Sequence, residues 1–390
     1  QLWPFWMARK ARDWVMGNMF GGTLSNGSIA VFIPAGRMKG PGVPLDLNRN
    51  ELQISFDLAD GRVNLPADIP PLRDIYGRFD LKGEAMQVDI TQAGSFFPSG
   101  RAVKVEGGRF SIPSTYAKPL MADIALKLSG PADAIAELTS FKPINGLKNT
   151  EFKPSDFSGT AKVDVKAQFG LVNDQNPPKP VWNAHADLRD VALATPVSGR
   201  KISNIDGTLD IDPQSARLSA KAAIDEVPAD VTLVQPIESA STVKREQVIK
   251  AVLSDSQRDK LVPGLSEIVQ GTISVELTRL DDTRQGVSLD LTRSALSIPG
   301  IGWTKGNGVG PKAQFEIAGE GLQRTELKNF ELVGDGFGAQ GNIVLTNGSL
   351  SSAEFSSARL SPSDNFSVAV KQSKGVFDVS IGGSSADIRP

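Results

Sequence analysis

Apolar and polar residues alternate along most of the chain with a period of two. In residues 161–169, AKVDVKAQF, every odd position is apolar and every even position is charged or carries an amide. Successive side chains of a β-strand point to opposite faces of a sheet, so this alternation predicts strands with one apolar and one hydrated face. We therefore expect a mainly β fold whose apolar face is lined by Leu52, Ile54, Phe56, Ile124, Leu126, Leu128, Val163, Val165, Phe169, Leu289, Leu291, Phe366, Val368, Val370, Phe377, Val379 and Ile381.

Turn sequences separate the alternating segments and indicate how the strands are joined. Asp60-Gly61 separates LQISFDLA from RVNL, and Asn347-Gly348 separates GNIVLT from SLSSAEF. Asp-Gly and Asn-Gly pairs readily adopt the positive φ angles that two-residue hairpins require. We expect hairpins at both places and a sheet that is mostly an antiparallel meander.

Two segments have the spacing of amphipathic helices instead. Residues 4–19 begin with Pro4, which suits the first turn of a helix, and repeat apolar residues at helical intervals. Residues 243–261 follow Thr242, which can act as an N-cap, and end before a Pro-Gly pair. We expect both helices to cover apolar sheet, although a basic amphipathic helix can also lie on a membrane surface.

Composition excludes several classes of function. Lys and Arg number 42 and Asp and Glu 44, so the balanced charge gives no electrostatic basis for a nucleic-acid partner. The chain has no Cys and a single His, which excludes thiol catalysis, disulfides and Cys/His zinc sites. It begins with Gln1 and contains no run of about 18 apolar residues. We expect neither a signal peptide nor a membrane span in it, and we interpret the chain as a fragment of a longer protein.

The sequence contains no recognisable catalytic arrangement. His185 has no second His or Cys with which to share a metal, and we expect it to lie on the surface or to pack within a strand. Asp281-Asp282 suits a hairpin loop, and the glycines of residues 334–341 precede a strand rather than a phosphate-binding helix. An enzyme acting on polysaccharide would need a pair of carboxylates in a cleft, and no such pair stands out. We expect no enzyme, no metal and no cofactor.

Several blocks of the sequence resemble a known family. VSLDLTRSALSIPGIGWTKGNGVG at 287–310, LKNFELVGDGFGAQGNIVL at 327–345 and VSIGGSSADIRP at 379–390 resemble, in wording and order, the AsmA-like superfamily and in particular its YhdP-like branch from Gram-negative bacteria. The block at 11–36 is similar to a Trp-containing helix of that branch that leads through a Gly-Gly turn into a strand, and the block at 72–96 to its recurring strand block. The likeness covers most of the chain and concerns structural motifs rather than binding residues.

The resemblance implies a long, twisted antiparallel sheet, folded lengthwise into an open, β-taco-like gutter with a few short helices. It also implies a location in the periplasm and attachment to the inner membrane through an N-terminal anchor that this chain lacks. Members of the branch are thought to be bridges along which phospholipids move toward the outer membrane. The apolar positions named above would then line a groove and contact phospholipid acyl chains, and an outer-membrane partner could complete the path.

Alternation alone leaves other folds and functions open. A β-sandwich or a β-solenoid shows the same pattern, because each also buries one apolar face. We expect residues 1–172 to form the N-terminal part of the sheet, with the leading amphipathic helix, and residues 173–390 the C-terminal part, with the helix near 243–261, in one continuous body. A Pro-rich and amide-rich loop at 173–180 marks the change. The alternative function is a periplasmic scaffold that assembles outer-membrane proteins through open strand edges.

Overall fold

The computed structural model describes most of the chain, and strands dominate it. The described residues are 9–38, 40, 45–148, 150–238, 241–261, 268–298, 303–305, 310–318, 323–347, 349–373 and 376–385. The chain divides into two compact units, one of residues 1–218 and 236–243 and the other of residues 219–235 and 244–390.

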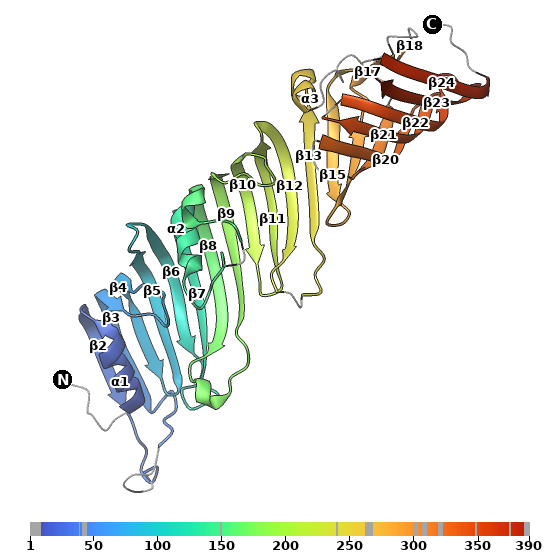
Figure 1. Ribbon diagram of the computed structural model, residues 1–390. Helices are drawn as coiled ribbons and strands as arrows, with labels where there is room; N and C mark the ends of the chain where they lie inside the picture. The colour runs from blue at the N-terminus through green and yellow to red at the C-terminus, as the bar shows by residue number, and fades with distance from the viewer. Residues whose placement is uncertain are drawn as a thin grey trace. The chain divides into compact units, whose positions relative to one another are not determined.

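The first unit is an open antiparallel sheet with one helix on its face. Its elements are α1 (Arg9–Asn18), β1 (Met19–Phe20), β2 (Thr23–Val31), β3 (Leu52–Val63), β4 (Leu72–Lys82), β5 (Ala85–Phe96), β6 (Ala102–Ile112), β7 (Met121–Pro131), α2 (Ala132–Ser140), the 3-10 helix η1 (Pro154–Asp156), β8 (Phe157–Gly170), the 3-10 helix η2 (Asn173–Gln175), β9 (Val181–Leu193) and β10 (Ile202–Ile211). From β2 to β10 each strand pairs antiparallel with the next one along the chain, and the short β1 pairs with β3. Figure 1 shows these strands side by side, with α2 lying across the sheet. Among the described residues no pairing joins β2 to β10, so this sheet does not close into a barrel.

The second unit repeats this plan. The strand β11 (Ser215–Ile224) contributes residues to both units. The elements that follow are β12 (Val227–Pro236), β13 (Glu246–Leu253), α3 (Asp255–Leu261), β14 (Val269–Gly271), β15 (Ile273–Arg279), β16 (Arg284–Asp290), β17 (Ser294–Ile298), β18 (Trp303–Lys305), β19 (Lys312–Ala318), β20 (Arg324–Val333), β21 (Gly338–Thr346), β22 (Ser349–Arg359), β23 (Asn365–Ser373) and β24 (Val376–Ser385). Antiparallel pairing runs from β12 through β13, β15, β16 and β19 to β24 in chain order. The strands β14, β17 and β18 form a separate small sheet.

These ladders confirm the predicted mainly β, antiparallel and open architecture. A β-sandwich would need a second large sheet stacked on the apolar face of the first. Within the described part of each unit, that face instead carries a short element, which is α2 in the first unit and the sheet β14–β17–β18 in the second.

The helix predicted for residues 243–261 is wrong over half of its length. Residues Glu246–Leu253 form the strand β13, and only Asp255–Leu261 are helical, as α3. The segment EQVIKAVL is rich in β-branched residues, and its backbone pairs with β12 on one side and with β15 on the other. Backbone pairing with two flanking strands therefore decides the conformation of this segment, although its apolar residues have a helical spacing.

The other local predictions have mixed outcomes. The helix expected over residues 4–19 is confirmed at Arg9–Asn18, whereas Met19 belongs to the strand β1, and residues 4–8 lie outside the described residues. The hairpin expected at Asp60-Gly61 is wrong, because β3 runs through both residues, and Asp60 has a φ of 56° where the register with β4 shifts. Asn347, with a φ of 51°, joins β21 to β22, which pair as predicted.

The loop at 173–180 lies between β8 and β9, as its composition predicts, and contains η2. It falls inside the first unit, however. The chain passes from the first unit to the second within residues 218–244, at β11, β12 and the segment that follows β12.

Candidate functional site

The strand register of the first unit places apolar side chains from β3 to β9 on one face. In an antiparallel sheet, directly opposite residues project to the same side. One row crosses the sheet through Phe56, Phe79, Val88, Phe110, Ile124, Ala167 and Trp182. The neighbouring row consists of Leu58, Gly77, Ile90, Gly108, Leu126, Val165 and Ala184. Every lining position predicted for this unit lies on the same face, namely Leu52, Ile54, Phe56, Ile124, Leu126, Leu128, Val163, Val165 and Phe169.

Two glycines in the second row allow close approach between strands. A Cβ atom at Gly77 would collide with the backbone carbonyl of Asp89, and a Cβ atom at Gly108 with that of Ala125. Glycine within a strand often marks a bend where another backbone comes near. At Gly77 and Gly108 the apolar face therefore has no side chain, whereas in the first row the same two strands contribute Phe79 and Phe110.

The helix α2 covers one end of the apolar face and makes it a packed core. Ala134 is fully buried there, and Val163 of β8 is only 8 % exposed. Arg101 holds the helix in place, because its Nε lies 2.5 Å from an oxygen of Asp133 and its Nη1 lies 2.9 Å from an oxygen of Glu137. The other residues of this cluster include Ile75, Ala93, Phe97, Val103, Val105, Leu128, Ile135, Leu138, Phe141, Ala161 and Ala186.

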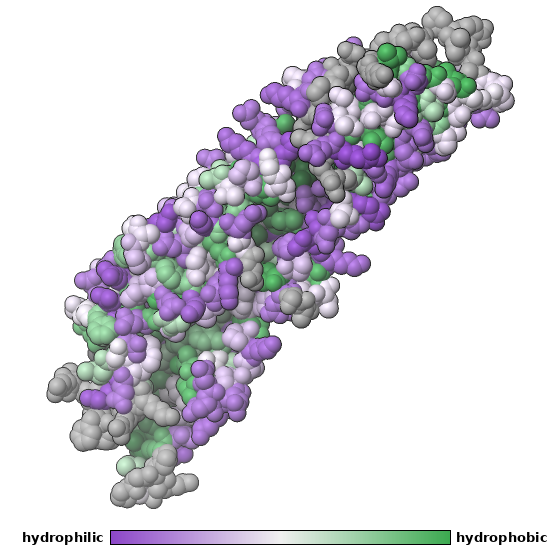
Figure 2. All heavy atoms as spheres, in the orientation of Figure 1, coloured by the Kyte–Doolittle hydropathy of each residue, from purple (hydrophilic) through white to green (hydrophobic). Residues whose placement is uncertain are grey.

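Beyond α2, the apolar rows remain partly exposed to solvent. Phe56 and Phe79 stack with their ring centroids 4.7 Å apart, yet both are only half-buried, as are Phe110 and Ile124 in the same row. Figure 2 shows apolar side chains in a hollow flanked by hydrophilic ones over the part of the picture that holds β3 to β9. Exposed apolar surface that is this continuous marks a binding surface more often than an inert one.

The opposite face of the first unit is hydrated and charged. Asp57, Arg78, Asp89 and Arg109 stand opposite one another on β3, β4, β5 and β6. Arg78 pairs with Asp57 at 2.9 Å, and Arg109 pairs with Asp89 at 2.6 Å. Opposite charges across neighbouring strands support this register, because a slip by one residue would bring charge onto the apolar side.

His185 belongs to this outer face. Its Nδ1 lies 2.6 Å from Oδ1 of Asp210 on β10, and its Nε2 lies 3.9 Å from Oδ1 of Asp187. The hydrogen bond to Asp210 raises the pKa of His185 above its ordinary value. His185 therefore lies on the surface, within a strand, as expected from the sequence. In the described residues, no group of three His, Asp or Glu side chains could hold a metal ion.

The second unit has its own apolar face. One row passes through Ala251, Val275, Leu289, Ala313, Leu332, Ala339, Ala358 and Phe366. Alternation along β23 adds Val368 and Val370 to this face, and their partners Ile381 and Val379 extend it onto β24 together with Phe377. Leu291 follows β16 and lies in the core cluster of the same face.

The small sheet β14–β17–β18 covers part of this second face. Val269, Leu296 and Trp303 of the small sheet pack with Ile273 and Leu291. Lys305 of β18 is buried as well, donates to the carbonyl oxygen of Ser294 at 3.1 Å, and has its pKa lowered by burial.

The predicted lining positions therefore fall into two groups. Leu128, Val163, Leu291 and Phe366 are buried, whereas Phe377, Val379 and Ile381 of β24 are exposed. The remaining positions are half-buried. The sequence analysis also missed several lining residues, among them Phe79, Val88 and Phe110. Their segments alternate in the same way as residues 161–169, so the same signal could have found them.

No helix in the described part of the chain has the length and apolar character to cross a membrane. In comparisons with known proteins, no family model matches the chain, and neither a curated protein nor a solved structure matches it.

Proposed function

We propose that the chain is a non-enzymatic conduit that shields the acyl chains of phospholipids along the apolar faces of its two units. The observation that carries this proposal is the half-buried row from Phe56 to Trp182, which continues across seven neighbouring strands without a polar residue. An enclosed core would bury that row, and an ordinary wet face would contain polar side chains in it.

The chemistry of the two faces suits an amphiphile. Acyl chains gain about 0.8 kcal/mol for each methylene group removed from water, so a continuous aliphatic and aromatic surface holds them without specific contacts. Headgroups would stay in water at the open side of the sheet. Because neighbouring positions along a row are chemically alike, a bound chain can move from strand to strand without losing apolar contact. The direction of net movement would come from the membranes at either end.

The resemblance to the YhdP-like branch supports the same function and adds a location. On this proposal the chain works in the periplasm of a Gram-negative bacterium and is attached to the inner membrane. The hydrated outer face, with its ladder from Asp57 to Arg109, suits an aqueous compartment.

Site-specific crosslinking tests the conduit directly. A photoreactive phenylalanine analogue would replace Phe110, which lies in the open row, and as the matched control Ser111, which is adjacent in β6 and faces the other side. After irradiation in cells, mass spectrometry should find phospholipid attached at position 110 and none at position 111. Equal labelling at the two positions, or no lipid at position 110, would refute the conduit.

A scaffold for assembly of outer-membrane proteins is the second candidate, and the outermost strands favour it. Among the described residues, β2 pairs only with β3 and β24 only with β23. Ile29 and Ile381 on these strands are 74 % and 63 % exposed. Unpaired strand edges with exposed apolar residues can add a strand from a partner. Capture of an unfolded outer-membrane barrel by a chain that carries no phospholipid would favour the scaffold, and phospholipid that co-purifies with a chain unable to capture the barrel would favour the conduit.

A further inference from the structure

The open part of the apolar face in the first unit is narrowest at β6 and β7. On β7 the positions facing this side are, in order, buried at Ala122, half-buried at Ile124 and Leu126, and buried at Leu128. The neighbouring strand β6 has the same order of burial, with two half-buried positions between two buried ones. We call the half-buried positions of both strands the waist, namely Gly108, Phe110, Ile124 and Leu126.

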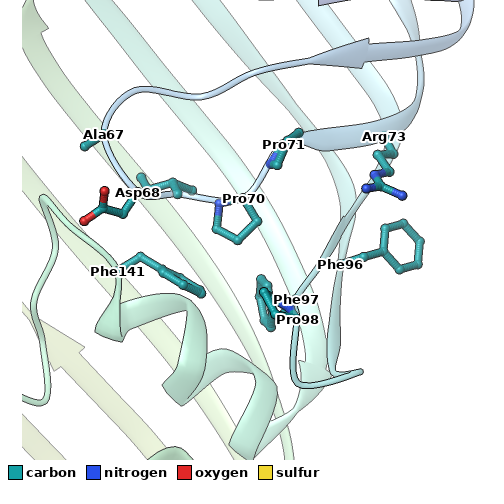
Figure 3. Close-up of a pocket in the computed structure, with 10 residues that line it drawn as sticks. Ala67, Asp68, Pro70, Pro71, Arg73, Phe96, Phe97, Pro98 and Phe141 are labelled. Atoms are coloured by element: carbon teal, nitrogen blue, oxygen red, sulfur yellow. The ribbon is translucent and has the colours of Figure 1, made fainter.

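Buried residues border the waist on both sides. Under α2, a row of directly opposite residues is buried, namely Ala93, Val105, Leu128, Val163 and Ala186. Figure 3 shows Phe97 and Phe141 beside the end of α2, and their ring centroids lie 5.6 Å apart. On the other side, Ala122 is fully buried, and Ile112 of β6 is only 8 % exposed. A side chain as large as isoleucine is buried only where other atoms cover it, so the open surface ends on both sides.

The spacing of residues in a strand gives the width of the waist. Residues on one face of a strand follow one another at intervals of two, which is about 7 Å. Two open positions between two buried ones therefore leave a surface about 14 Å wide. Carbon chains in contact lie about 4–5 Å apart, because nonbonded carbon atoms approach one another to about 4 Å. The two chains of one diacyl lipid need about 10 Å and fit, whereas the four chains of two such lipids need roughly 16–20 Å and do not.

We propose that the waist admits one diacyl lipid at a time, so that lipids pass the first unit in single file. This inference rests on the proposed function, because it takes the half-buried rows as the path of the acyl chains. It adds the class of lipid that can pass, since a lipid with two chains fits and a lipid with four chains on one head does not. Two lipids cannot exchange places at the waist, so each one advances only when the place ahead of it is empty.

The accessibility of single cysteines along β7 measures the width directly. The chain has no cysteine, so Ala122→Cys, Ile124→Cys, Leu126→Cys and Leu128→Cys each provide one thiol. In the delipidated chain, methyl methanethiosulfonate should modify positions 124 and 126 and leave positions 122 and 128 unmodified. Vesicles of dioleoyl phosphatidylglycerol should then slow the modification at 124 and 126 by about tenfold once lipid occupies most of the chains. Modification of all four thiols in urea verifies that each can react, and reaction at 122 or 128 in the folded chain overturns the waist.

Two lipids with the same head chemistry test which class of lipid fits. The delipidated chain is incubated with vesicles that contain dioleoyl phosphatidylglycerol and tetraoleoyl cardiolipin in equal amounts by phosphate, and mass spectrometry identifies the lipid bound after re-isolation. We expect bound phosphatidylglycerol to exceed bound cardiolipin by about tenfold or more, because the chains of cardiolipin that do not fit stay exposed to water. Equal uptake per phosphate overturns the limit of one diacyl lipid.

A substitution that narrows the waist gives a second test. Ile124→Trp places a larger side chain in the waist, and Ala125→Trp, on the exposed outer face of the same strand, is the matched control. Ile124→Trp should reduce binding of dioleoyl phosphatidylglycerol by about tenfold and retain single-chain lysophosphatidylglycerol, whereas Ala125→Trp should change neither. Equal loss of both lipids in Ile124→Trp would contradict a limit that is set by width.

These outcomes separate the inference from the proposed function. Without protection at positions 124 and 126, and without bound phosphatidylglycerol, the conduit itself fails. Protection at both positions, together with equal uptake of cardiolipin and phosphatidylglycerol, would keep the conduit and remove the single file.

Discussion

Val163 and Val165 provide a matched test of whether the apolar face is open. Both are valines of β8 on the same face of the sheet, opposite Leu128 and Leu126. Val163 lies under α2 and is 8 % exposed, whereas Val165 is half-buried at the border of the open rows. The substitutions Val163→Asp and Val165→Asp therefore introduce the same group into two environments that differ mainly in their cover.

The expected costs follow from burial. Replacing Val163 removes most of the roughly 1.5–3 kcal/mol that a buried valine contributes, and an acidic group without a partner there adds about 1–3 kcal/mol. We expect Val163→Asp to lower the free energy of unfolding by about 4 kcal/mol, a large part of the roughly 5–15 kcal/mol typical of a folded protein. At Val165 the new carboxylate can reach water, so we expect about half that loss.

Urea unfolding of both variants, combined with the phospholipid content of the purified protein, measures the two effects. If the chain is the proposed conduit, Val165→Asp should fold and carry clearly less lipid, because a carboxylate on the path would have to lose water each time an acyl chain passes. Lys166→Ser, on the outer face directly after Val165, is the control and should change stability by less than about 0.5 kcal/mol. Equal destabilisation at positions 163 and 165 would mean that the face is closed, and full lipid loading in Val165→Asp would mean that β8 does not line the path.

Three further predictions concern the frame of the first unit. The pKa of His185 is raised in the folded state, so the hydrogen bond to Asp210 stabilises the protein below the ordinary histidine pKa of about 6.5 and loses this effect as pH rises through the folded value. His185→Gln should therefore reduce stability in urea at about pH 5.5 and have no effect at about pH 9, and the opposite trend would contradict this assignment. Arg101→Met should speed hydrogen exchange in α2 and cost roughly 1 kcal/mol, while unchanged exchange would show that apolar packing alone holds the helix. Gly108→Ala should lower stability by about 2 kcal/mol or more, because its Cβ would collide with the carbonyl of Ala125, and a melting temperature equal to that of the wild type would contradict the close approach of β6 and β7.

Period-two alternation predicted the strands and the membership of the apolar face because it depends only on the geometry of a single strand. Residues 161–169 show this well, since all five apolar positions lie on the face that the register assigns to them. Whether that face would be covered could not be predicted in the same way. The helix α2 covers Val163. It has nine residues, and its apolar side chains are only alanines, one isoleucine and one leucine. So short a helix makes too few turns to give a strong helical pattern in the sequence.

The failed predictions share a cause, which is that the decisive partners lie elsewhere in the chain. Residues Glu246–Leu253 fit a helix in isolation but have strands on both sides in the fold. Asp60-Gly61 has the composition of a hairpin turn, yet β3 continues through it, because β4 accommodates the extra residue as a shift of register. The limits of the waist were also beyond reach, since Val105 and Leu128 are buried in the cluster under α2, which forms only after folding.

The pairing of each strand with its successor makes the length of such a sheet adjustable. Among the described residues of the first unit, every strand from β3 to β9 pairs with the strand before it and the strand after it along the chain, and β3 pairs with β1 as well. Insertion of a hairpin between two neighbours would lengthen the sheet by roughly 10 Å, at about 4.8 Å for each strand, and would leave the other pairings intact. Duplication or deletion of hairpins can therefore change the length of the apolar face in steps of two strands, without redesign of a core.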